Sequence, residues 1–257
     1  MTANAAHGSA FPSPGTGTRS SDPSPRGRLI AFVGSEATGK STIIDEMARW
    51  LGTRYRVRRI HAGKPPATRL TYVPHTLLPA LRRLLPGQRS THVERRLGRR
   101  DAADRETFPL VFGVRSVMLA YERRALIVRA SAAAAEGEIV LCDRYPSSLS
   151  GAPDSRQLGH LAVRDPIRRW LAAIEARWYR DIPFPDLAVV LTAPLDVTLA
   201  RNAARSKVEP EDHVRFRHGS SANLRFDGVD VAKVDTDRPL DEVVDDVRDA
   251  IAAILGR

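Results

Sequence analysis

Residues 34–42 carry the strongest chemical signal in the sequence. They fit the pattern G-x-x-x-x-G-K-[ST] and comprise Gly34, Ser35, Glu36, Ala37, Thr38, Gly39, Lys40, Ser41 and Thr42. In such a loop, backbone N–H groups and a helix N-terminus surround a phosphate, the lysine reaches the β- and γ-phosphates, and the next hydroxyl ligates Mg²⁺. The alternative is a chance match in a tight turn. We therefore predict nucleotide binding at 34–42, with ATP and Mg²⁺ as cofactors, Lys40 as a catalytic residue and Ser41 as a metal ligand.

The residues on either side of this loop have the pattern that such a site requires. Leu29 to Val33 is an apolar run typical of a strand buried on both faces. From Lys40 to Leu51 the apolar residues recur at three- and four-residue spacing, which predicts a helix packed on a sheet. A strand, a glycine loop and a helix in this order make phosphate binding the better interpretation.

A second motif follows a later apolar segment. Glu138 to Cys142 is predicted to form a strand that ends at Asp143-Arg144-Tyr145. In a phosphoryl-transfer site, an aspartate there holds a metal-bound water or orients the acceptor, and a neighbouring arginine binds phosphate oxygens in two-pronged fashion. The structural alternative is an ion pair that caps the strand. We predict that Asp143 and Arg144 are catalytic and that Asp143 also serves as a metal ligand.

These residues resemble those of thymidylate kinases and the wider group of P-loop nucleoside monophosphate kinases. Glu36 stands where that family commonly has an acidic residue in the phosphate loop, and Asp143-Arg144-Tyr145 is similar to its Asp-Arg-Tyr motif. The resemblance implies that Arg123, within Glu122-Arg123, helps to bind the acceptor phosphate. It also implies that Arg201 and Arg205 begin a lid, at about 201–228, whose arginines close over the phosphates.

The acceptor side departs from the family pattern. Residues 61–66 read His-Ala-Gly-Lys-Pro-Pro where typical thymidylate kinases have Arg-Glu-Pro-Gly-Gly-Thr, and the usual base-contact segment after Tyr145 is absent. Lys64 is a candidate anion contact or a solvated loop lysine. The resemblance therefore covers the ATP half well and puts thymidylate itself in doubt.

Length and composition suggest one domain. The chain has 257 residues, one cysteine and a formal net charge of +10, which favours anionic ligands. We expect residues 1–27 to be a disordered tail and 28–257 a single P-loop kinase domain. The arginine-rich segment 67–108 lacks interleaved aromatic residues, so we interpret it as a solvated face and consider nucleic acid unlikely as a partner. A stripe of Ile167, Trp170, Leu171, Ile174 and Trp178 is expected to face the core.

The sequence predicts a three-layer α/β P-loop fold with a five-stranded parallel sheet, helices on both faces and an arginine-bearing lid. The expected function is Mg²⁺-ATP-dependent phosphoryl transfer to a small anionic acceptor, with a nucleoside monophosphate as the expected acceptor. A P-loop kinase of another small molecule is the first alternative, and a nucleotide-dependent ATPase or switch is the second. We expect a cytoplasmic protein with no membrane partner, and the sequence is compatible with a homodimer.

Overall fold

The computed structural model describes residues 26–68, 71, 108–159, 165–206, 208–221 and 223–256. Its elements are β1 (Arg28–Gly34), α1 (Lys40–Leu51), β2 (Val57–His61), α4 (Leu110–Ala135), β3 (Ile139–Asp143), α5 (Pro166–Arg180), β4 (Leu187–Thr192), α6 (Leu195–Ala203), α7 (Glu211–Ser221), β5 (Asp230–Asp235) and α8 (Leu240–Leu255). The expectations for the tail at 1–25 and for nearly all of the arginine-rich segment 67–108 lie outside the described residues. Gly27 is buried, so the chain is already packed one residue before β1 begins.

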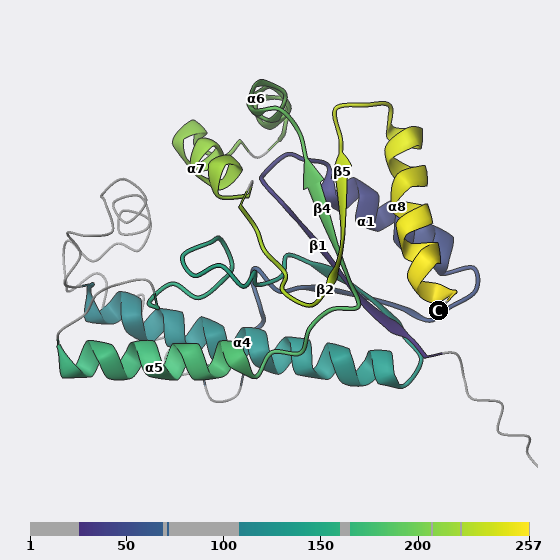
Figure 1. The fold of residues 1–257 in the computed structure, drawn as a ribbon. Helices are drawn as coiled ribbons and strands as arrows, with labels where there is room; N and C mark the ends of the chain where they lie inside the picture. The colour runs from purple at the N-terminus through teal and green to yellow at the C-terminus, as the bar shows by residue number, and fades with distance from the viewer. Residues whose placement is uncertain are drawn as a thin grey trace, which may run out of the picture.

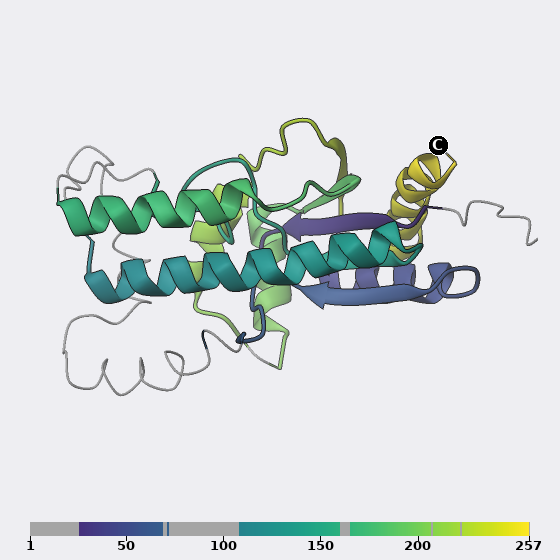
Figure 2. The same cartoon turned by 90° about the horizontal axis from the view of Figure 1, so that it is seen from below.

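The described strands form one parallel sheet in the order β2-β3-β1-β4-β5. Alternate residues of β1 face opposite layers, because successive side chains of a strand point to opposite faces. Ile30 and Phe32 pack in the core with α1 and α8, whereas Ala31 and Val33 pack in the core with α4. Figures 1 and 2 show these helices on the two sides of the sheet. The predicted three-layer fold with a five-stranded parallel sheet is confirmed.

Helices α4 and α5 run side by side and extend well past the sheet (Figures 1 and 2). Because α5 packs mainly on α4, only a narrow stripe of it is covered. Leu171 is buried, but Trp170 is 62% exposed and Ile167 is 58% exposed. The expectation that this whole stripe faces the core was therefore wrong for these two residues. In the part of the chain that the structure describes, no helix is long and apolar enough to cross a membrane.

The sheet order places a binding crevice at its centre. β1 lies between β3 and β4, so the connections from β1 and β4 leave toward opposite sides. In open α/β sheets, ligands bind beyond the carboxyl ends of the strands at this switch point. The loop after β1, the end of β3 and the helices α6 and α7 meet at this edge (Figure 1).

Candidate functional site

The loop between β1 and α1 has the backbone conformation that its glycines permit. Gly34 has φ 146°, and a Cβ there would lie 2.3 Å from the carbonyl oxygen of Leu191 on the neighbouring strand. Gly39 adopts the left-handed conformation with φ 80° just before the helix begins. Side chains at these positions would push the strand away or strain the turn, so glycine is required for the loop to close over β1 and β4.

Lys40 is folded back into this loop. Its ammonium donates to the carbonyl oxygens of Gly34, at 3.2 Å, and Ser35, and lies 3.4 Å from the Thr38 hydroxyl. Only 7% of the residue is exposed. Burial lowers the pKa of Lys40 to about 8, with a further lowering from Arg144, because the buried charge is only partly compensated. The loop thus holds a desolvated cation whose best available partner would be an anion.

Asp143 ends β3 beside the phosphate loop. Its Oδ1 atom is buried and has no hydrogen-bond partner, and its Oδ2 atom lies 3.6 Å from Nδ1 of His61. A buried carboxylate oxygen without a partner is costly unless a ligand satisfies it. β3 therefore ends in a carboxylate that can bind a metal ion or a metal-bound water.

Arg144 is held in an uncommon backbone conformation. Its φ is 67°, and its backbone N–H donates to Phe32 O at 2.9 Å, which continues the ladder from β3 to β1. A Cβ on Gly63 would lie 2.2 Å from Cδ of Arg144, so the glycine of the loop after β2 leaves room for this side chain. A left-handed arginine costs free energy that the surrounding contacts must offset, and such strain concentrates at functional sites.

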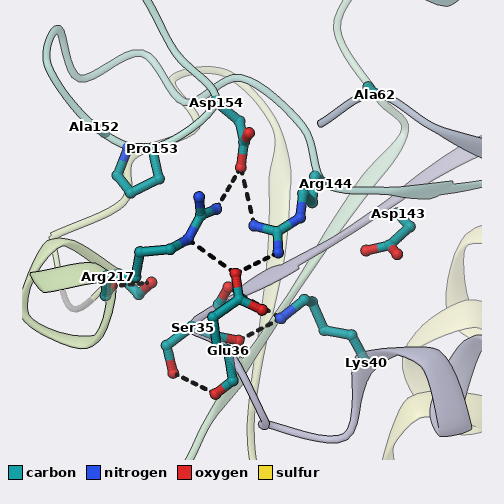
Figure 3. Close-up of polar contacts among 12 residues, drawn as sticks. Ser35, Glu36, Lys40, Ala62, Asp143, Arg144, Ala152, Pro153, Asp154 and Arg217 are labelled. Atoms are coloured by element: carbon teal, nitrogen blue, oxygen red, sulfur yellow. Dashed lines mark hydrogen bonds and ion pairs between the residues drawn. The ribbon is translucent and has the colours of Figure 1, made fainter. Parts of the chain in front are cut away.

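Arg144 belongs to a closed ring of alternating charges (Figure 3). Its two terminal nitrogens bind Glu36 at 2.6 Å and Asp154 at 3.2 Å. Arg217, on α7, lies 3.3 Å from the same Glu36 oxygen and 2.6 Å from the same Asp154 oxygen. Burial alone would raise the pKa of Glu36, but Arg144, Arg217 and Lys40 outweigh it and lower the pKa to about 2. The ring therefore ties the phosphate loop, the end of β3, the segment after it and α7 together.

Arg123 lies beneath this ring and does not line the pocket. Its Nε donates to Ala62 O at 2.7 Å, one terminal nitrogen donates to the Tyr179 hydroxyl, and another lies 3.6 Å from Asp154. Its side chain is only 5% exposed. The structure thus places Arg123 in contact with Asp154 and the end of β2, and it is not among the residues that line the pocket; the resemblance implied that it helps to bind the acceptor phosphate.

Arg201 and Arg205 reach the pocket from the α6 side. Arg201 donates to the carbonyl and hydroxyl oxygens of Thr236, at 2.9 and 3.3 Å, which ties α6 to the end of β5. Arg205 is exposed, its backbone N–H donates to Asn202 O at 3.3 Å, and its side chain makes no hydrogen bond or ion pair within the described residues. The Asn202 amide bonds both the N–H and the C=O of Glu209, which holds the turn from α6 toward α7. The predicted lid region is therefore built around two helices.

These groups face one pocket of about 710 Å³. Its lining residues are Glu36, Ala37, Gly39, Lys40, Ser41, Thr42, His61, Gly63, Lys64, Asp143, Arg144, Asp154, Arg201, Arg205, Glu209, His213 and Arg217. Sequence reasoning missed Asp154, Glu209, His213 and Arg217 as site residues. Arg217 offered a signal, since it is one of several basic residues in the predicted lid, whereas Asp154 lies in a loop with no recognisable motif.

Comparison with known proteins agrees with this geometry. No family model matches the chain. A protein of Nitrobacter winogradskyi named thymidylate kinase is 31% identical over 232 residues, which cover 86% of each chain. Another, from Pseudomonas syringae pv. syringae, is 30% identical over 187 residues, 71% of this chain and 72% of that protein.

The chain belongs to the thymidylate kinase family of P-loop kinases. It is also 22% identical over 244 residues, 88% of this chain, to an Escherichia coli K12 protein named "Uncharacterized ATP-binding protein YghR". Family membership supports nucleotide-dependent kinase chemistry at the level of the family. At 30 to 31% identity, family membership does not determine the acceptor, which has to be inferred from the residues of the site.

Proposed function

We propose that the protein transfers the γ-phosphoryl group of Mg²⁺-ATP to a small acceptor. The observation that carries this proposal is the shared pocket, in which the phosphate loop, the carboxylate at the end of β3 and the arginines of α6 and α7 face one another. Phosphoryl transfer depends on positioning and on neutralising charge that spreads over the transferred group, and this collection of cations is suited to both tasks.

On the ATP side, residues 34–42 would surround the β- and γ-phosphates, with Lys40 leaving its carbonyl partners for the phosphate oxygens. Asp143 and the Ser41 hydroxyl would hold Mg²⁺, which when bound neutralises charge on the phosphates. The unpartnered Oδ1 of Asp143 fits this role. The described residues contain no group of three or more His, Cys, Asp or Glu side chains that could hold a metal ion by themselves. We therefore expect Mg²⁺ to bind together with the nucleotide.

On the acceptor side, Arg144 and Arg217 line the pocket together with Arg201 of α6 and Arg205, which follows α6. We propose that Arg201 and Arg205 stabilise the transferred group, since Arg205 has no competing partner among the described residues. We assign Arg123 to positioning, because its contacts are with Ala62, Tyr179 and Asp154.

Two acceptor classes fit this proposal. A nucleoside monophosphate is supported by the relatives named thymidylate kinase. A small molecule without a phosphate group is supported by a specific observation, that carboxylates already bind both terminal nitrogens of Arg144. A DNA-dependent ATPase is less well supported, because the residue after Asp143 is an arginine rather than the glutamate that usually activates water, and a guanine-nucleotide switch is less well supported because the sequence has no Asn-Lys-x-Asp motif.

The experiment that tests the proposal is a transfer screen with γ-labelled ATP. Nucleoside monophosphates, nucleosides, sugars and sugar phosphates would be offered singly, and labelled products separated by chromatography. We expect a labelled small product that depends on both Mg²⁺ and the acceptor. Label released only as inorganic phosphate, at a rate that no acceptor changes, would contradict the proposal.

A further inference from the structure

Two basic side chains that line the pocket have no partner of their own. Lys64 and Arg205 are exposed, and their side chains make no hydrogen bond or ion pair within the part of the chain that the structure describes. The other lysine and arginine side chains of the lining each have a hydrogen-bond or ion-pair partner: Lys40, Arg144, Arg201 and Arg217. A phosphate group gains most from a cation whose charge no neighbour already offsets. Lys64 and Arg205 can therefore bind a phosphate group without losing another contact.

Lys64 and Arg205 come from opposite sides of the phosphate loop. Lys64 follows β2, whereas Arg205 follows α6, the helix after β4. In the sheet, β1 lies between β2 and β4, and the phosphate loop extends from its carboxyl end (Figure 1). The attacking and leaving oxygens of a phosphoryl transfer lie roughly in line with the phosphorus, so donor and acceptor enter from opposite sides. Lys64 is on the β3 side, where Asp143 and Arg144 also line the pocket.

The residue that the resemblance assigned to the acceptor phosphate is not in the pocket lining. The side chain of Arg123 is only 5% exposed, and it has partners beneath the pocket. One of them is Ala62 O, which accepts from its Nε at 2.7 Å and lies two residues before Lys64. Arg123 therefore supports the turn that carries Lys64, and a different cation has to contact the acceptor.

The turn after β2 is held firmly beside β3. The backbone N–H of Ala62 donates to Asp143 O at 2.9 Å, which extends the contact between the two strands. Gly63 packs so closely on Arg144 that a Cβ there would lie 2.2 Å from Cδ of the arginine. The backbone of Lys64 therefore starts from a fixed place at the edge of the pocket. Its ammonium, on a flexible four-carbon stem, can reach an anion there.

We infer that Lys64 binds the phosphate group of a nucleoside monophosphate acceptor, the role that the resemblance implied for Arg123. The inference rests on the proposed phosphoryl transfer and names a residue of its acceptor site. In the transfer, an oxygen of the acceptor phosphate forms a bond to the γ-phosphorus, the bond from that phosphorus to the β–γ bridging oxygen breaks, and its electron pair stays on ADP. The two phosphate groups repel each other as they approach, and an ammonium beside the acceptor reduces this repulsion. A lysine is suited to this task because it binds phosphate as a point charge, without two-pronged geometry.

The first test changes the charge at position 64. Nucleoside monophosphates are screened on the wild-type protein with γ-labelled ATP, and the one with the highest kcat/KM is used throughout. Lys64→Met keeps most of the stem and loses the charge, so the KM for this acceptor should rise by about tenfold or more. The Kd for ATP should change by less than about threefold, and Lys64→Arg should keep the acceptor KM within about threefold of wild type.

The matched control is Lys233→Met. Lys233 is also exposed, but it lies on β5, at the opposite edge of the sheet from β2, and does not line the pocket. Its substitution should leave the acceptor KM unchanged. A wild-type KM in Lys64→Met would overturn the inference and make Lys64 a solvated loop lysine, with phosphoryl transfer still established. Transfer only to acceptors without a phosphate group would also overturn the inference, whereas ATP consumption that yields only inorganic phosphate would overturn the proposed transfer itself.

The second test needs neither a variant nor turnover. The chain has only four lysines, so the labelling of each by an amine-reactive reagent can be followed by mass spectrometry: Lys40, Lys64, Lys207 and Lys233. At ten times its Kd, the nucleoside monophosphate alone should slow labelling of Lys64 by about tenfold, because only the unbound fraction reacts. Labelling of Lys233 should not change, and ATP alone should protect Lys40 rather than Lys64.

Two results of the labelling experiment would contradict the assignment of Lys64. Protection by ATP alone, with none from the nucleoside monophosphate, would place Lys64 on the ATP side of the pocket. Equal protection by the corresponding nucleoside, at ten times its own Kd, would show that Lys64 lies beside the base or the sugar rather than the phosphate group. Protection by the monophosphate that the nucleoside does not reproduce is the result that the inference predicts.

Discussion

The two halves of the pocket handle buried positive charge in opposite ways. In the ATP half, Lys40 is surrounded by carbonyl oxygens, and burial lowers its pKa to about 8. In the acceptor half, burial would lower the pKa of Arg144, but Asp154 and Glu36 outweigh burial and raise it above its usual range. Lys40 therefore has too little neighbouring negative charge to offset its burial, whereas Arg144 has two carboxylates in ion-pair contact. Of the two, Lys40 is therefore the cation whose charged form gains more from an added anion such as a phosphate group.

The largest effect is expected from Lys40→Ala. Transfer should fall by about 100-fold or more, because a single preorganised charge contact typically contributes that much to the rate. The fold should survive, since the ammonium is a buried charge that its neighbours only partly compensate, and its removal relieves desolvation. Transfer kinetics and thermal denaturation check the two statements, and residual transfer above about a tenth of the wild-type rate would show that the ATP half is misassigned.

The next largest effect is expected from Arg144→Lys, which disrupts the ion-pair ring on the acceptor side of the pocket. An ammonium cannot contact Glu36 and Asp154 in the two-pronged geometry of a guanidinium, so the ring opens. We expect kcat/KM for the acceptor to fall by about tenfold or more while the Kd for ATP changes by less than about threefold. Calorimetry and transfer kinetics measure these quantities. A rise in the Kd for ATP as large as the fall in kcat/KM for the acceptor would show that Arg144 contributes to ATP binding.

Arg123→Ala is expected to act on stability rather than on nucleotide affinity. The substitution leaves Asp154 with one fewer counter-charge and removes the hydrogen bond to Ala62 O, in a setting that is almost fully buried. We expect the free energy of unfolding to fall by about 3 kcal/mol. Urea denaturation measures the change, with Arg124→Ala as a more exposed neighbour on the same helix. An unchanged urea midpoint together with a lower kcat/KM for the acceptor would instead indicate that Arg123 binds the acceptor.

The smallest effect concerns pH. With the pKa of Lys40 near 8 in the free protein, the side chain loses its proton as pH rises through 8, whereas a bound triphosphate favours the charged form. ATP binding should therefore take up a proton above pH 8, and affinity should decline by up to about tenfold per pH unit. Calorimetry in buffers of different ionisation enthalpy detects the uptake. The pH dependence should disappear in Lys40→Met, whose apolar side chain cannot be protonated.

The phosphate loop and the helix after it could be predicted from the sequence because the information for them is local. Helix α1 begins and ends at the predicted residues, and the phosphate loop follows from glycines and a lysine at fixed spacing within residues 34–42. The five-stranded parallel sheet also followed, because apolar segments alternating with helices favour parallel strands whose carboxyl ends meet at one edge, although the order of the strands was not predicted.

The acceptor half of the pocket could not be predicted from the sequence in this way, because its ion pairs join residues that lie far apart along the chain. Arg217 lies 63 residues from its partner Asp154 in the chain, and Arg144 lies 108 residues from its partner Glu36. Glu122 and Arg123 interrupt an apolar pattern in α4, but the sequence does not say whether such residues face the pocket or pair beneath it. Trp170 similarly shows that an apolar stripe predicts a helix face without showing how much of that face is covered.

The measurement that tests the central claim most directly is the stoichiometry of transfer. With an acceptor from the screen, ADP, labelled acceptor product and inorganic phosphate are quantified in the same reaction, with Lys40→Ala as the blank. Phosphoryl transfer predicts close to one labelled product for each ADP and little inorganic phosphate. ADP matched by inorganic phosphate, with no labelled product and a rate unaffected by any acceptor, would contradict the assignment of this pocket to a kinase.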